Sequence, residues 1–98
     1  MIVEYIRYRL HPDRIDEFAD AWAAAAPLVR RNPHNRSLEV ARCLDDPGVH
    51  TVRIIWDSRE GHTEGFRGHA DFEEFTAHVG RFHDAMEELR HYEVLGGI

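Results

Sequence analysis

Two histidines stand among aromatic residues in positions that suit acid–base chemistry. His62 follows Trp56, which ends a strand-like run, and precedes Phe66 by one helical turn. His83 falls on the apolar side of a later helical pattern when successive residues are placed about 100° apart. An imidazole titrates near neutral pH, so either side chain suits the role of acid, base or hydrogen-bond partner for a ligand. The alternative is a packed histidine at the border of the core, and spacing alone leaves both open.

Strand parity and helical spacing direct these side chains toward one gap between a sheet and its helices. Three further aromatic residues are expected to complete a cavity there: Tyr8, Phe72 and Tyr92. Such a cavity suits a flat apolar ligand. Within it, we expect His62 or His83 to accept a phenolic proton. His62 is preferred, because its short glycine-rich helix is the element least explained by core packing.

The segment that carries His62 changes its pattern abruptly. Residues 51–56 alternate as a strand, and Asp57 with Glu60 has the spacing of a capping box that opens a helix. Gly61 and Gly65 follow one turn apart, and each costs about 1 kcal/mol relative to alanine inside a helix. Either close packing against a neighbouring element or a bare wall of a pocket would explain them.

The remaining elements follow in a regular order. We predict a strand over 2–10, a helix from Pro12 or Asp13 that Pro27 kinks or ends early, and a hairpin over 37–57. A single long helix is expected over 72–89 and a last strand over 91–95. The fold class is therefore α+β, a ferredoxin-like βαββαβ arrangement with a four-stranded antiparallel sheet, and 1–98 form a single domain.

Two helices cover only one face of such a sheet. The other face is predicted to mix apolar and charged side chains: Val3, Tyr5, Ile55 and Cys43 among Arg7, Arg9, Arg53 and Glu39. This composition favours a sheet-to-sheet homodimer with ion pairs between subunits. A solvated face with a few exposed apolar residues is the alternative.

Composition narrows the classes of partner and site. A net charge of −6 argues against nucleic acid, which requires a basic footprint. No apolar run is long enough to span a membrane, no signal peptide is visible, and the single cysteine, Cys43, fits a reducing cytoplasm. No nucleophile elbow or phosphate loop occurs. No two histidines are three or four residues apart, and the His–carboxylate pairs at that spacing are better explained as surface ion pairs, so we expect no metal.

Over essentially its full length the chain resembles the antibiotic biosynthesis monooxygenase family. The likeness is carried by the order and spacing of several short segments: Ile2–Tyr8, Trp56-Asp57-Ser58, Glu60-Gly61-His62, Glu64–Arg67, Phe72, Phe75 and Glu87–Glu93. The resemblance implies a dimeric α/β barrel and oxygenation of phenolic or hydroquinone substrates without metal, flavin or heme. In that chemistry the substrate anion supplies electrons to O₂, and the protein contributes a dry pocket and a proton acceptor.

Within the resemblance, Trp56 matches the family's recurrent tryptophan at the end of a strand, and His62 stands one turn before the usual histidine position. The heme-degrading branch has an asparagine where this chain has Ile6 or Arg7, and a histidine near Phe75. Our first hypothesis is accordingly a cofactor-independent monooxygenase for a small aromatic compound. The second is a non-catalytic dimeric module that binds a small aromatic or isoprenoid ligand, and the third is heme binding or degradation.

Overall fold

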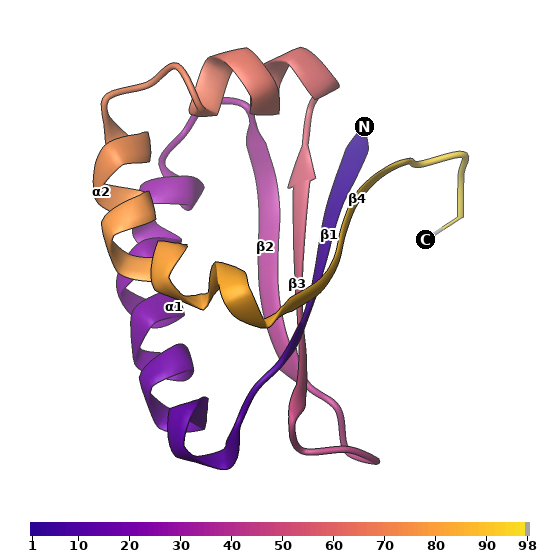
Figure 1. Ribbon diagram of the computed structural model, residues 1–98. Helices are drawn as coiled ribbons and strands as arrows, with labels where there is room; N and C mark the ends of the chain where they lie inside the picture. The colour runs from indigo at the N-terminus through magenta and orange to yellow at the C-terminus, as the bar shows by residue number, and fades with distance from the viewer. Residues whose placement is uncertain (98) are drawn as a thin grey trace.

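In the computed structural model, which describes residues 1–97, four antiparallel strands form one sheet in the order β2-β3-β1-β4 (Figure 1). They are β1 (Ile2–Arg9), β2 (Asn35–Arg42), β3 (Val49–Trp56) and β4 (Met86–Glu93). Helices α1 (Ile15–Arg30) and α2 (Asp71–Val79) cover the same face of this sheet (Figure 1). The ferredoxin-like α+β prediction is therefore confirmed, and the central strands β1 and β3 form the floor on which the helices pack.

Alternation in β1 and β3 places their apolar side chains under the helices. Tyr8, Val52 and Ile54 are at most 1% exposed, and they contact the buried side of α1. The prediction that Pro27 ends or kinks this helix early was wrong about its end, because α1 continues to Arg30. The last turn is held by packing, since Leu28 and Val29 beyond the proline are buried.

The predicted long helix over 72–89 is divided into two shorter helices and a strand. Helix α2 ends at Val79, a 3₁₀-helix η3 (Gly80–Ala85) follows, and β4 begins at Met86. Gly80 lies at the break, where its low helix propensity favours a change of geometry. The apolar residues keep a helical spacing of three and four positions past this break. The reason is that Met86 and Leu89 reach the same interior from strand β4.

A bulge in the β1–β4 pairing explains that spacing. Arg7 pairs with Glu88 whereas Tyr8 pairs with Met86, so Glu87 is an extra residue in β4. Beyond the bulge, Glu4 faces His91 and Val3 faces Tyr92. Successive strand residues point to opposite faces, so His91 shares the helix-covered face with Glu4, and Tyr92 lies on the other.

The second face of the sheet has the predicted mixed composition. Val3 is buried, and Tyr5 and Ile55 are half-buried although no helix covers them. Its arginines already have partners in the same chain. Arg9 pairs with Glu87 and Asp46, and Arg53 with Glu39, in exposed ion pairs of 3.0–3.3 Å. These arginines thus have partners within one chain, and ion pairs between subunits stay a prediction.

Candidate active site

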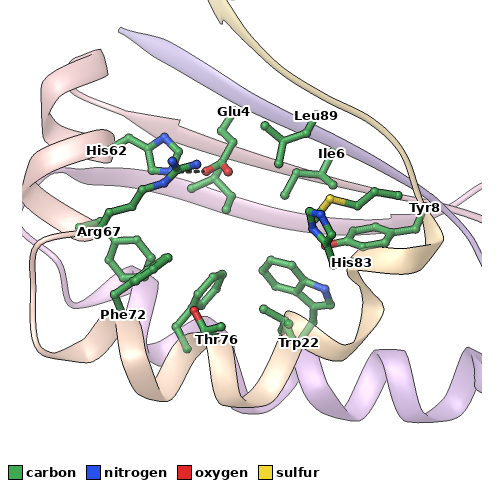
Figure 2. A pocket seen from close by; sticks show the side chains of 16 residues that line it. Glu4, Ile6, Tyr8, Trp22, His62, Arg67, Phe72, Thr76, His83 and Leu89 are labelled. Carbon is green, nitrogen blue, oxygen red and sulfur yellow. Dashed lines mark ion pairs between the residues drawn. The ribbon is translucent and has the colours of Figure 1, made fainter.

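A cavity of about 230 Å³ lies between the helices and the sheet (Figure 2). Ile6, Tyr8 and Ile54 form its floor, and Phe75 and Val79 of α2 form the opposite wall. Its interior is mostly apolar, with polar groups gathered at the two ends (Figure 2). Exposed residues such as Thr76 and Leu89 also line it, so a ligand that enters is partly open to water and is oriented by a small number of polar contacts.

At one end lies the side chain of Glu4, a carboxylate on the core face of β1 that is only 8% exposed. The indole Nε1–H of Trp56 donates to Glu4 Oε1 over 3.1 Å. His62 Nε2 lies 3.2 Å from the same oxygen, on the cavity side that Figure 2 shows. The polar contacts that Glu4 makes within residues 1–97 all end on Oε1. Oε2 is left to the cavity, which Glu4 lines.

Burial changes the proton affinity of both partners toward their neutral forms. It raises the pKa of Glu4, and the hydrogen bond from Trp56 and the charge of Arg67 only partly oppose this. Burial, Arg67 and the neighbouring imidazole of His91 together lower the pKa of His62 to about 4. At neutral pH the contact therefore joins a neutral imidazole to the carboxyl group and is not an ion pair.

His62 is held on both sides. Its ring stacks on Trp56 with centroids 5.0 Å apart and an interplanar angle of 14°. Its Nδ1 lies 2.8 Å from Nε2 of His91, which reaches it from β4. Both ring nitrogens are thus engaged, and the side chain is only 3% exposed. The orientation of the imidazole is fixed before any ligand binds.

The helix that carries His62 is a π-helix, η2 (Gly61–Phe66), in which the amide of Arg67 donates to the carbonyl of His62, five residues back. Ser58 rather than Asp57 caps its start, since Ser58 Oγ accepts from the amide of Gly61 over 2.9 Å. The predicted capping box of Asp57 and Glu60 is therefore wrong, because Ser58 is the residue that caps the helix.

The glycines of this helix fit against His34. A Cβ atom at Gly65 would collide with the His34 ring, and one at Gly61 would collide with Asp57 and His34. His34 is fixed in turn, because its Nδ1 lies 2.9 Å from Asp57 Oδ2. Close packing is thus the explanation of the two glycines, and this packing directs His62 to the cavity from the opposite side of the helix.

The other end of the cavity carries Tyr8, Trp22 and His83 (Figure 2). Trp22 is buried, and within residues 1–97 its Nε1–H has no hydrogen-bond partner. Burial, with the charge of Glu4, raises the pKa of Tyr8, so its hydroxyl stays protonated. His83 lies on η3 at the rim and is exposed, contrary to its predicted place on a buried helix face.

The structure brings most of the predicted residues together. Tyr8, His62, Phe66, Phe72 and His83 line the cavity, and Trp56 lies directly behind His62. The prediction for Tyr92 is wrong, because it is 46% exposed on the opposite sheet face, where its ring packs edge-on to Tyr5. Its neighbour His91 points to the helix-covered face instead, where it contacts His62.

Sequence reasoning missed Glu4, His91 and Arg67. A signal for Glu4 was present, since it alternates with Ile2, Ile6 and Tyr8 and is the one charged residue on that apolar face. Arg67 lies at the end of η2 and lines the cavity beside Glu4 and His62 (Figure 2). Within residues 1–97 no cluster of three or more His, Cys, Asp or Glu side chains is arranged to hold a metal ion.

The ferredoxin-like sheet with a buried pocket under its helices defines a class of small α+β domains. The family model for antibiotic biosynthesis monooxygenases matches residues 1–80, and the chain belongs to this family. The uncharacterized protein YczJ of Bacillus subtilis is 29% identical over 77 residues, which are 79% of this chain and 81% of that protein.

Solved structures agree with the family. A Bordetella bronchiseptica protein assigned to it is 26% identical, covers 96% of each chain and has a TM-score of 0.78. A point mutant of SnoaB, a cofactor-independent oxygenase from Streptomyces nogalater, has a TM-score of 0.81 at 14% identity and covers 99% of this chain and 95% of that one. The likeness to the SnoaB mutant shows the fold alone. None of the helices in residues 1–97 has the length and hydrophobicity needed to cross a membrane.

Proposed function

We propose that this chain is a cofactor-independent monooxygenase that oxidises a small phenolic or hydroquinone-like compound with O₂. The observation that carries the proposal is the buried Glu4–His62 pair at one end of an apolar cavity. Burying a carboxylate costs free energy, so its place in a cavity wall calls for a chemical reason. A proton acceptor in a dry pocket is what oxygenation through a substrate anion requires.

Within the pair, we assign the proton-accepting role to Glu4 rather than to His62. Both nitrogens of His62 are already engaged, whereas Glu4 Oε2 is left to the cavity. His62 then positions the carboxyl group by holding Oε1. His83 lies at the other end, near Tyr8, where it suits contact with the far side of a ligand (Figure 2).

Arg67 supplies what a carboxyl group alone lacks. A phenol ionises near pH 10, well above even a raised carboxyl pKa, so proton transfer to Glu4 is unfavourable unless the phenolate is stabilised. The guanidinium of Arg67 is a permanent positive charge at the same end of the cavity. Arg67 is an exposed residue at the rim of the cavity, and a phenolate formed beside it gains electrostatic stabilisation from this charge.

The size and polarity of the cavity narrow the substrate. An apolar cavity of about 150 Å³ holds a benzene molecule, so the 230 Å³ found here suits one or two substituted rings. The unpartnered Nε1–H of Trp22 offers a hydrogen bond at the end opposite Glu4. A ring with oxygen atoms at both ends, as in a hydroquinone, satisfies both.

The proposed reaction balances without a further reductant. A phenol with a free ring position and O₂ give a quinone and water. One oxygen atom becomes the new carbonyl, and the other leaves as water with the hydroxyl hydrogen and the ring hydrogen. The four electrons that reduce O₂ come from the substrate. Glu4 takes the hydroxyl proton first, and one proton has to be supplied again when the second oxygen leaves as water.

We also propose that two copies associate through the uncovered sheet face, and that the protein works in a reducing cytoplasm. The homodimer is supported by the apolar side chains of Val3, Tyr5 and Ile55 on the uncovered sheet face. Ion pairs within the chain surround these side chains and leave no net charge there. The half-buried free thiol of Cys43 suits a reducing cytoplasm.

Oxygen uptake with a panel of hydroquinones and anthrones tests the function. We expect turnover by the native chain, and a kcat lower by about 10²–10⁴-fold for Glu4→Gln, which keeps the shape but cannot accept a proton. His11→Gln, an exposed change at the start of the 3₁₀-helix η1 (Pro12–Arg14), is the matched control. Tight binding without turnover would overturn the proposal in favour of a binding module, and a Soret band on heme titration would overturn it in favour of heme binding.

A further inference from the structure

The close contact between Glu4 and His62 continues toward the surface through a hydrogen bond to β4. Glu4 and His91 are direct neighbours across β1 and β4, and η2 places His62 between their side chains. The chain of contacts runs from Glu4 Oε1 to His62 Nε2 over 3.2 Å, and from His62 Nδ1 to His91 Nε2 over 2.8 Å. We propose that Glu4, His62 and His91 form a proton path between the cavity and solvent, with His91 as the residue that exchanges the proton with water.

The two ends of the path have the required access. Glu4 lines the cavity, and its Oε2 is not among the buried polar atoms without a partner. His91 is half-buried, and within residues 1–97 its Nδ1 makes no hydrogen bond and is not shut off from solvent. The middle member, His62, is only 3% exposed. A proton therefore reaches the carboxyl group from water through His91 even when a ligand fills the cavity.

Two arrangements of hydrogens satisfy every contact, and they differ by one proton. In the first, Glu4 is ionised, His62 Nε2–H donates to it, and His91 Nε2–H donates to His62 Nδ1. In the second, Glu4 is protonated on Oε1 and donates to His62 Nε2, and His62 Nδ1–H donates to His91 Nε2. Shifting each hydrogen one place outward converts the second into the first and releases one proton to water from His91 Nδ1.

The surrounding charges keep the middle of the path neutral. Arg67 at the end of η2 and the ring of His91 oppose a positive charge on His62, and Arg59 and Arg67 oppose one on His91. On the floor, Trp56 of β3 donates to Glu4, and Tyr8 of β1 remains neutral. His83 lies across the cavity at its other end (Figure 2). Protons consequently move by a concerted shift and do not rest on His62 as imidazolium.

The path rests on the proposed function for its purpose, but its existence is testable without a substrate. The nitrogen-15 chemical shifts of the histidine rings distinguish Nδ1–H from Nε2–H. On raising the pH, we expect His62 to change from the Nδ1–H to the Nε2–H form, with the same midpoint as the loss of the carbonyl infrared band of protonated Glu4. Glu4→Gln should abolish both changes. A His62 tautomer that stays fixed while Glu4 titrates would overturn the path, whether or not the protein is an oxygenase.

The turnover rate of a His91 variant is the second test of the proton path. His91→Ala should lower kcat by about tenfold or more with little change in KM, and imidazole added to the buffer should restore part of the loss by occupying the vacated site. His11→Ala removes an exposed histidine elsewhere and should respond to neither change. A His91→Ala variant that is as active as the native chain, or is slowed but folded and insensitive to imidazole, would overturn the role of His91.

Discussion

The imidazole of His62 lies flat against the indole of Trp56, and the Nε2 and Nε1 atoms of these two rings meet the same oxygen of Glu4. The indole thus stacks on one member of the Glu4–His62 pair and donates a hydrogen bond to the other. A change in the charge of His62 must therefore be felt at Trp56, which gives the site its own spectroscopic reporter.

We predict that the fluorescence of Trp56 follows the protonation of His62. The chain has two tryptophans, so Trp22→Phe leaves Trp56 as the sole emitter. A protonated imidazole quenches a stacked indole, and burial lowers the pKa of His62 to about 4. Emission should fall on acidification with a midpoint near pH 4, and His62→Gln should remove the transition. A midpoint near 6.5, the ordinary histidine value, would contradict the described environment.

The free energy of unfolding should depend on pH through the same residue. Because the folded-state pKa of His62 is lowered from 6.5 to about 4, the unfolded chain binds protons more tightly between these values. The stability contributed by neutral His62 is present above pH 6.5 and is lost toward pH 4, by at most about 3 kcal/mol.

Glu4 acts in the opposite direction. Its raised pKa means that the folded chain binds the proton more tightly, so its contribution falls as the pH rises above the ordinary carboxyl value. Glu4→Gln should therefore deepen the loss of stability on acidification. Urea unfolding at pH 7 and pH 4.5 measures this, and an equal or smaller loss in the variant would contradict the assigned directions.

The contact between η2 and His34 predicts a specific coupling. Gly65→Ala should destabilise the chain by about 1–3 kcal/mol, since the new methyl group collides with the His34 ring. In a His34→Ala background the same change should be nearly neutral, because the obstacle is gone. Thermal unfolding of the four variants in this double-mutant cycle gives the coupling energy. Glu64→Ala, an exposed change in the same helix, is the control, and additive effects would argue against the contact.

The proposed homodimer is tested by one charge on the uncovered sheet face. Ile55→Asp should convert a dimer to a monomer, because an unpaired carboxylate would be buried in the interface. Light scattering at micromolar concentration should then change from about twice the chain mass of 11.4 kDa to that mass. Leu44→Asp, at a position 94% exposed, should leave the mass unchanged. A native chain that is already monomeric would refute the proposal.

Local patterns were enough to predict the strands that form the floor of the site and their faces. Residues 51–56 alternate clearly and residues 2–10 imperfectly, and the topology follows from the order of the elements. The helix predicted over 72–89 failed because Met86 and Leu89 satisfy helical spacing from a bulged strand. The register of β4 against β1 decides whether His91 or Tyr92 faces the helices. Residues close to His91 and Tyr92 in the sequence do not reveal this register.

The active-site geometry was less accessible from sequence for a related reason. The glycines of η2 pack against His34, which is distant in the chain, and spacing within residues 57–67 did not reveal a π-helix. The carboxyl group of Glu4 was overlooked because its apolar neighbours on β1 indicate an ordinary core strand. Its role emerges only from the hydrogen bond that Trp56 donates to it. His62 and Arg67 lie at the same end of the cavity (Figure 2).

The π-helical turn at residues 61–66 also affects how such a site arises in a lineage. A turn in which the Arg67 amide bonds to His62 is an α-helix with one residue inserted. Deleting a single codon there would restore α-helical bonding and rotate His62 by about 100° relative to Arg67, away from Glu4. The carboxylate–imidazole pair can therefore be lost through a one-residue deletion in η2 that leaves every side chain of the cavity floor unchanged.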